Sequence, residues 1–224
     1  MRVEEQAAYY LEAIQTLCPQ GPYYFLGLSF GGFLAFEIAQ RLRARGELVG
    51  MLGMLDNLLM GSEVKPAKPS WLQSKWMRRV KLIAGHLAHL VKPDPVHYFK
   101  IQFRTRILKA AYNFLYARGK QIPRFLRRPI DINWFAARRY KPGFYPGRVT
   151  LFQTVASASR PHATSGLWAG LAGEGIEIVE VPGTHDNFLR EPNVQSLAKA
   201  VTVCLRKYQG SMPSVRADDR VSKA

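Results

Sequence analysis

The sequence has few cysteines, few acidic residues and no long apolar run, and each shortage excludes a class of protein. Its two cysteines, Cys18 and Cys204, belong to no Cys/His spacing pattern. We therefore expect neither a disulfide framework nor a zinc site, and we expect both to be buried, reduced residues. No segment reaches the roughly 18 uncharged apolar residues of a membrane helix, and acidic charge comes early, unlike in a secretory signal. These absences predict a cytoplasmic protein with no transmembrane segment.

Acidic residues are scarcest in the middle of the chain. The 224 residues include 32 Lys/Arg and 16 Asp/Glu, a net charge of +16, and residues 61–150 hold 20 of the basic residues but only 3 acidic ones. A basic region of this kind attracts nucleic acid, an anionic membrane surface or an acidic protein, or is simply a solvated surface. Composition leaves these four interpretations open. The apolar fraction of 47% is enough to fill the core of one domain.

Strand-like and helix-like segments alternate along the rest of the chain. Apolar periodicity predicts helices at Val3–Leu17, at about 31–46 and at 194–208. Short apolar runs predict strands at Tyr23–Leu28, 48–56, 148–154 and 176–182, the first of them buried on both faces. This alternation predicts an α/β fold with a mostly parallel sheet flanked by helices.

A long segment interrupts the alternation between the second and third predicted strands. It is rich in aromatic and basic residues, broken by prolines, and helical in period where it has one. We therefore expect a helical lid insert at 58–145, a core formed by 1–57 and 146–210, and a flexible tail at 211–224.

A serine lies between glycines where the first strand passes into a helix. The stretch "GLSFG" fits the G-x-S-x-G nucleophile elbow around Ser29. So tight a turn predicts glycine at 27 and 31, because bulkier residues would collide with neighbouring backbone. The amino end of the following helix would face any negative charge formed there, which makes the Phe30 N–H a predicted oxyanion-hole donor. A glycine-rich turn with an incidental serine is the alternative.

A nucleophilic serine needs a base and an acid that orients the base. His185, in "VPGTHDNF", follows the last predicted strand and would lie at the same sheet edge as Ser29. Asp56 ends the strand after the serine helix, whereas Asp186 would have to bend back to reach the ring beside it. The chain order Ser29, Asp56, His185 is the order found on α/β-hydrolase sheets. A turn histidine and a strand-end turn aspartate are the alternatives.

The remaining histidines are weaker candidates. His86, His89 and His97 lie in the insert, and the first two could form a metal pair, but no carboxylate stands at helical spacing from them. A surface position in the insert is favoured for them. His162 lies in a polar loop. The sequence therefore predicts no metal site at any of these four histidines.

Three segments resemble one known family. "YYLEAIQTLCPQGPYYFLGLSFGGFLAFEIAQRL", "GMLGMLD" and "VEVPGTHDNFLREPNVQSLAKAV" are similar to the thioesterase domains that terminate nonribosomal peptide and polyketide assembly lines. The resemblance covers about residues 2–208, and the 27-residue separation of Ser29 and Asp56 suits it. It implies that Ser29 attacks an acyl thioester, with His185 as base and Asp56 orienting it, and that water or a nucleophile within the acyl chain then releases the product.

The resemblance also implies the partner and the cofactor. The acyl chain would arrive on the phosphopantetheine of a carrier protein, so we expect no cofactor bound by this chain itself. Carrier proteins of such systems are acidic, which gives the basic insert a partner and makes nucleic acid unexpected.

The sequence departs from the family's pattern at its start. Members normally begin with further strands and a glycine-containing loop that supplies a second oxyanion donor, whereas this sequence begins at the helix before Tyr23–Leu28. We expect the N-terminal strands to be missing, that strand to be an exposed apolar edge, and activity to be impaired, since one lost donor costs about 2.7 to 4 kcal/mol. A fragment of a longer synthase or a late start codon would explain this, and a genuinely short, inactive protein is the less favoured explanation. A freestanding editing thioesterase, a general lipase or esterase, and a non-catalytic basic binding module are the competing functions.

Overall fold

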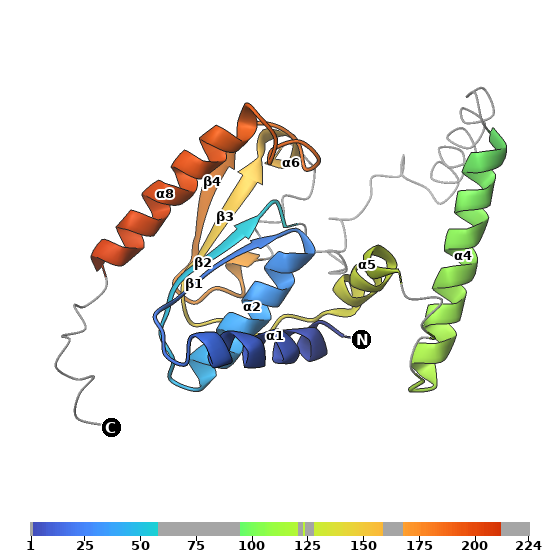
Figure 1. Ribbon diagram of the computed structural model, residues 1–224, viewed down its shortest axis with the longest axis horizontal. Helices are drawn as coiled ribbons and strands as arrows, with labels where there is room; N and C mark the ends of the chain where they lie inside the picture. Colours follow the sequence, from blue (N-terminus) through green and yellow to red (C-terminus); the bar gives the residue numbers. More distant parts are fainter. Residues whose placement is uncertain (1, 58–94, 121–122, 124–127, 159–167, 212–224) are drawn as a thin grey trace, which may run out of the picture. The chain divides into compact units, whose positions relative to one another are not determined.

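The computed structural model describes residues 2–57, 95–120, 123, 128–158 and 168–211. The chain divides into two compact units, Met1–Gly61 with Ala136–Ala224, and Ser62–Phe135 (Figure 1). No helix among the described residues is both long and apolar enough to cross a membrane.

A four-stranded sheet forms the centre of the first unit (Figure 1). Its strands are β1 (Tyr23–Leu28), β2 (Val49–Leu55), β3 (Val149–Thr154) and β4 (Ile176–Val181), and they lie in that order. Each neighbouring pair is parallel. The carboxyl ends of all four strands therefore meet at one edge of the sheet. The predicted α/β fold with a parallel sheet is confirmed.

Helices cover both faces of this sheet. Among the described residues, the helices of the first unit are α1 (Val3–Leu17), α2 (Phe30–Ala44), α6 (Val155–Ala158) and α8 (Asn193–Ser211), and α5 (Pro129–Arg139) includes residues of both units. Figure 1 shows α2 and α8 on opposite sides of the sheet. Gly46, at φ 79°, follows α2 in the left-handed conformation that glycine adopts without strain, at the position where the sequence predicted the helix to end.

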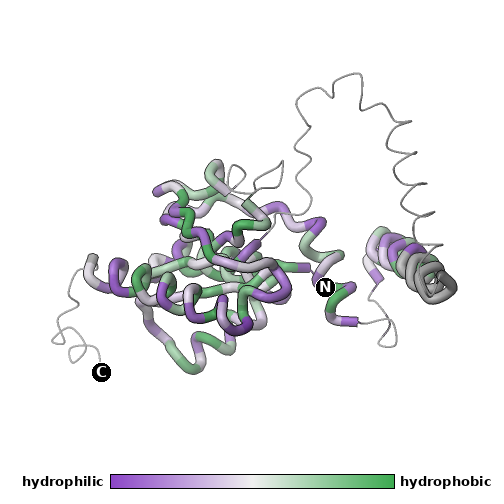
Figure 2. The backbone as a smooth tube through the Cα atoms, turned by 90° about the horizontal axis from the view of Figure 1, so that it is seen from above, coloured by the Kyte–Doolittle hydropathy of each residue, from purple (hydrophilic) through white to green (hydrophobic). Residues whose placement is uncertain are grey.

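The period of two along a strand distributes side chains to the two faces. Leu52 and Met54 of β2 pack with Phe36 of α2, whereas Met51 and Leu55 pack with Leu197 of α8. Strands β2 and β3 are buried along nearly their whole length, and Figure 2 shows hydrophobic stretches in green running through the first unit between hydrophilic ones in purple. A strand buried on both faces needs this near-continuous apolar pattern.

Strand β1 is less buried than the sequence predicted. Leu26 is 46% exposed and Leu28 is 38% exposed, so burial on both faces was wrong for β1. The reason is the strand order, because β1 pairs only with β2 among the described strands. The other expectation for this segment, an exposed apolar edge strand, agrees with that order.

The end of α1 is exposed, and one further expectation was wrong there. Leu17 is 84% exposed, so the buried stripe of α1 runs through Val3, Ala7 and Leu11 and does not reach the last turn. Cys18, which follows that turn, is exposed rather than buried as expected, whereas Cys204 is buried as expected, on the core-facing side of α8.

The second unit contains α4 (Pro95–Ala117) and the first part of α5. The rings of Tyr112 and Phe135 meet edge to face with centroids 5.3 Å apart, and the Lys109 ammonium lies 4.4 Å from the Trp134 ring centroid. Residues 136–145, which the sequence assigned to the insert, belong to the first unit, where Ala136, Tyr140 and Tyr145 lie in its core. Most of the expected tail, 212–224, lies outside the described residues.

Candidate active site

Ser29 occupies the turn between β1 and α2. Its φ of 48° is unusual for a residue other than glycine, and its N–H donates to the Leu55 carbonyl at 3.0 Å. Gly27 makes the turn possible, since a Cβ there would lie 2.6 Å from the Gly31 carbonyl carbon and the Gly32 nitrogen. The elbow predicted from "GLSFG" therefore has the backbone strain and close packing that such a turn requires.

The requirement for glycine differs from the predicted one at the second position. A Cβ on Gly31 would meet nothing within 4 Å, so the predicted collision at 31 was wrong. The crowded position is Gly32, where a Cβ would lie 2.5 Å from the Asn57 amide nitrogen. The first turn of α2 faces open space at Gly31 and the end of β2 at Gly32.

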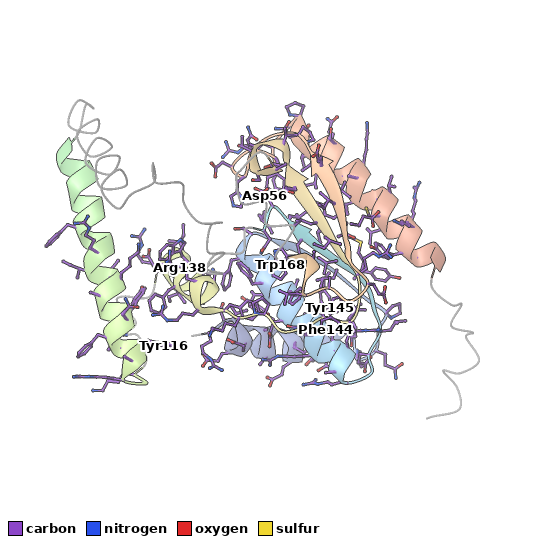
Figure 3. The ribbon with its side chains drawn as sticks, turned by 180° about the vertical axis from the view of Figure 1, so that it is seen from behind. Asp56, Tyr116, Arg138, Phe144, Tyr145 and Trp168 are labelled. Atoms are coloured by element: carbon purple, nitrogen blue, oxygen red, sulfur yellow. The ribbon has the colours of Figure 1, made fainter. Side chains whose placement is uncertain are left out.

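Asp56 and His185 form a hydrogen-bonded pair. The Asp56 carboxylate oxygen Oδ2 lies 2.8 Å from His185 Nδ1, with the Asp56 side chain fully buried and the His185 side chain 36% exposed. Figure 3 shows Asp56 near the carboxyl ends of the strands, while Phe144 and Tyr145 lie toward the opposite end of the sheet. Asp186, the poorer candidate from the sequence, is exposed and is not the partner of this ring.

Two hydroxyls that the sequence did not indicate also bind Asp56. Thr154 donates from its N–H at 3.2 Å and from its hydroxyl at 3.1 Å to Oδ1, and the Ser157 hydroxyl donates at 3.1 Å to Oδ2. Thr154 ends the predicted third strand at the expected edge, which was the available signal for it. Ser157 lies in the four-residue helix α6, too short to leave a periodic pattern.

A short turn holds the His185 loop. Gly183 has a φ of 99°, and the Thr184 N–H donates to Asn187 Oδ1 at 2.7 Å. Phe188 is 1% exposed in the core beneath α8, and its ring centroid lies 6.4 Å from that of His185. The loop is thus anchored beneath α8 while the imidazole stays accessible.

The backbone brings Ser29 beside the Asp56–His185 pair. Asn57, which follows Asp56, donates from Nδ2 to the Ser29 carbonyl at 2.5 Å. Ser29, Asp56 and His185 follow β1, β2 and β4 at the carboxyl edge, although the described residues include no hydrogen bond from the Ser29 hydroxyl to the His185 ring. Phe30 begins α2, where first-turn N–H groups have no acceptor within the helix. This arrangement can place a hydroxyl, a base and a hydrogen-bond donor around one carbonyl group.

The other histidines add no site to the described part of the chain. His86, His89 and His162 lie outside the described residues, as does the side chain of His97 in α4. The described residues contain no group of three or more His, Cys, Asp or Glu side chains that could hold a metal ion.

Comparison with protein families and curated proteins gives one consistent result. The family model described as "Thioesterase domain" matches residues 2–205. Malpibaldin synthetase of Mortierella alpina is 26% identical over 208 residues, which cover 92% of this chain and 3% of that protein. Enterobactin synthase component F of Escherichia coli is 52% identical over 54 residues, which cover 24% of this chain and 4% of that protein. The chain therefore spans only a few per cent of the length of these relatives.

Solved structures show the same fold. The thioesterase domain of NocB, in a covalent complex with a fluorophosphonate nocardicin G analog, aligns with a TM-score of 0.56 at 23% identity, covering 92% of this chain and 75% of that one. The SrfTE thioesterase domain that cyclises surfactin aligns with a TM-score of 0.55 at 16% identity, covering 93% and 76%. Because the family model spans nearly the whole sequence, this chain belongs to the thioesterase domain family, in the type found in nonribosomal peptide and polyketide synthases.

Proposed function

We propose that this chain is a serine thioesterase that releases an acyl, peptidyl or polyketide chain from the phosphopantetheine thioester of a carrier protein. The observation that carries the proposal is the 2.8 Å Asp56–His185 pair at the sheet edge where the Ser29 elbow also lies. Family membership supports the reaction class, and this geometry supports the residues.

The first step transfers the acyl chain to Ser29. His185 Nε2 accepts the hydroxyl proton as Ser29 Oγ bonds to the thioester carbon, and Asp56 stabilises the imidazolium through Nδ1–H. The carbonyl oxygen gains negative charge and accepts a hydrogen bond from the Phe30 N–H. The carbon–sulfur bond then breaks, and the imidazolium gives its proton to the leaving sulfur. An acyl-Ser29 ester and a free pantetheine thiol result.

The second step releases the acyl chain by the same proton transfers. His185 takes a proton from a water molecule as the water oxygen bonds to the ester carbon, and Ser29 Oγ leaves with that proton to give a carboxylic acid. A hydroxyl or amine of the acyl chain in place of water gives a cyclic ester or amide. Water or this internal nucleophile can reach the ring because the His185 side chain is 36% exposed.

The experiment that tests this function is covalent labelling with a fluorophosphonate, which traps an activated serine. The parent chain is expected to carry one label on Ser29 by mass spectrometry, and Ser29→Ala none, with both folded by circular dichroism. Folded parent protein that takes no label would overturn the proposal and would favour the non-catalytic basic module.

We also propose an acidic carrier domain as the partner of the second unit. Residues 62–135 hold 16 Lys/Arg and 3 Asp/Glu, a net charge of +13 out of +16 for the chain. A net positive charge of this size speeds encounter with an acidic protein at low salt. The lid role expected for the insert stays a prediction.

A charge-reversal experiment separates docking from chemistry. Arg106→Glu with Lys120→Glu reverses two exposed charges on α4 and just beyond it. We expect kcat/KM to fall for an acyl-carrier substrate at low salt but not for a small thioester without a carrier. Equal kcat/KM values of parent and double variant on the acyl-carrier substrate would contradict the docking proposal.

A further inference from the structure

We propose that Asn57 is a positioning residue that fixes the Ser29 elbow and aims the Phe30 N–H, an inference that rests on the proposed role of Ser29. Asn57 is 1% exposed, and its side-chain Nδ2 donates to the Ser29 carbonyl at 2.5 Å. The two residues come from different strand ends and are 28 positions apart. This bond ties the turn after β1 to the end of β2.

The Asn57 side chain is poorly suited to a purely packing role. Its Oδ1 is buried and has no hydrogen-bond partner among the described residues. Burying an unpaired amide oxygen is unfavourable, and an apolar side chain of similar volume would fill the space without that cost. Within the part of the chain that the structure describes, the side-chain hydrogen bond of Asn57 goes to the elbow, which indicates what the amide provides.

The Ser29 carbonyl, which accepts this hydrogen bond, fixes the orientation of the Phe30 N–H, the proposed oxyanion-hole donor. The Ser29 carbonyl and the Phe30 N–H belong to one planar peptide unit, in which the C=O and N–H bonds point in opposite directions. Holding the Ser29 oxygen toward Asn57 therefore points the Phe30 N–H away from it, in the direction required of an oxyanion donor. Donation to the carbonyl also polarises the peptide and strengthens its N–H as a donor.

The local backbone needs such support. Ser29 has φ 48° and ψ −114°, a conformation that persists only when surrounding contacts enforce it. The Gly32 N–H donates to the same Ser29 oxygen at 3.0 Å from within the turn, whereas the Asn57 amide donates to it from the end of the neighbouring strand β2.

The end of β2 thus serves two tasks with consecutive residues. Asp56, at φ 44°, turns its carboxylate to His185, and Asn57 turns its amide to Ser29. Gly32 leaves room for that amide, because a Cβ there would lie 2.5 Å from Nδ2. Substitution of Gly32 by alanine is therefore a second way to displace Asn57 without changing it.

The test compares Asn57→Leu and Gly32→Ala with a matched control. Leucine keeps the branched shape and the number of heavy atoms of the side chain and removes the donor, and circular dichroism checks that the variant folds. Thr150→Val is the control, since Thr150 is fully buried and shares a 3.0 Å hydrogen bond with Tyr208 under α8. The measurements are the second-order rate of fluorophosphonate labelling, kcat and KM for a thioester substrate, the pH–rate profile, and hydrogen exchange of the peptide spanning residues 27–33.

For Asn57→Leu we expect labelling and kcat to fall at least about tenfold with KM within about twofold, because misaimed groups weaken transition-state binding. The inflection of the pH–rate profile should not move, since the Asp56–His185 bond is untouched. Hydrogen exchange of the peptide spanning residues 27–33 should be faster in Asn57→Leu than in the parent. Gly32→Ala should show the same changes in labelling, kcat and exchange. Thr150→Val should stay within about twofold of the parent in every rate.

Folded Asn57→Leu with parental labelling, kcat and exchange would overturn the inference, and so would Thr150→Val that loses as much activity. If the folded parent takes no label, the proposed function fails, and exchange at 27–33 alone decides whether Asn57 fixes the elbow. Parental exchange in that case overturns the inference too.

Discussion

Gly27 and Gly31 flank Ser29 symmetrically in sequence but not in space. A Cβ on Gly27 would strike the backbone at Gly31 and Gly32, whereas one on Gly31 would meet nothing within 4 Å. Gly31 also lies in the first turn of α2 with an ordinary helical φ, where alanine is the better helix former.

We therefore predict opposite effects for the two alanine variants. Gly27→Ala should lower the free energy of unfolding by more than about 1 kcal/mol, because backbone must move, while Gly31→Ala should leave it unchanged or raise it by up to about 1 kcal/mol. Chemical denaturation of the two variants and the parent measures this. Equal losses of stability would mean that the elbow needs glycine symmetrically.

The hydroxyls around Asp56 should matter for both stability and turnover. The carboxylate is fully buried and accepts hydrogen bonds from Thr154 and Ser157 in addition to His185. Thr154→Val and Ser157→Ala each remove a donor from a buried charge, which we expect to cost about 1 to 3 kcal/mol of unfolding free energy and to lower kcat. Denaturation and thioester turnover check this, with Thr202→Val, whose exposed hydroxyl bonds only within α8, as the control.

Helix α8 is held on the sheet by a polar chain as well as by its apolar face. The Thr150 hydroxyl bonds to that of Tyr208 at 3.0 Å, Tyr208 donates to Glu177 at 3.1 Å, and the Lys207 ammonium donates to Glu177 at 2.6 Å. The hydrogen bond from Lys207, more than that from Tyr208, lowers the pKa of the Glu177 carboxyl, against the opposing effect of burial.

This lowered pKa gives a pH dependence with a definite sign. A carboxyl whose pKa is lower in the folded state stabilises the fold above its unfolded pKa and loses that contribution as pH falls through the folded value. Between about pH 5 and pH 3 the unfolding free energy of the parent should therefore fall more steeply than that of Glu177→Gln. Denaturant titrations across this range test it, and parallel curves would contradict it.

Short-range sequence patterns predicted the bounds of the helices and strands well, but they predicted the burial of individual side chains less well. Helix Val3–Leu17 has the bounds that its apolar period indicated, and strand Tyr23–Leu28 has those of its short apolar run. The exposure of Leu26 depends on strand order, which no short segment encodes. The sequence also proposed Asp56 and His185 as partners because both follow predicted strands at one sheet edge, and the structure joins them, while their catalytic roles stay predictions.

The residues that sequence analysis missed have partners far away along the chain. The Thr154 hydroxyl and Ser157 meet Asp56 across 98 and 101 positions. Asn57 lies next to a candidate residue, but its contact with Ser29 depends on how two strand ends pack, and an asparagine after a strand is by itself only a turn signal.

The first unit presents the open edge of β1 to its surroundings. Among the described strands β1 pairs on one side only, and Leu26 and Leu28 are partly exposed there. Such an edge invites pairing with another chain, which a lysine disfavours. We predict that Leu26→Lys lowers concentration-dependent aggregation, measured by light scattering at fixed salt, and that Leu17→Lys, at the more exposed end of α1, has less effect. Equal reductions in aggregation by the two variants would indicate a general effect of added lysine on solubility rather than a specific effect at the edge of β1.

The neighbours β2 and β3 pair Gly53 with Thr150, and Asp56 meets His185 across 129 positions, so the Asp56–His185 hydrogen bond depends on the late closure of a long loop during refolding. Contacts this distant in sequence form slowly, since the entropy of joining the ends is lost before the contact stabilises anything. Diluted from denaturant, the chain should therefore regain helical circular dichroism first and fluorophosphonate reactivity afterwards. On the ribosome, β2 must wait for 93 further residues of synthesis before its partner strand β3 begins to emerge, whereas its other neighbour, β1, is already made.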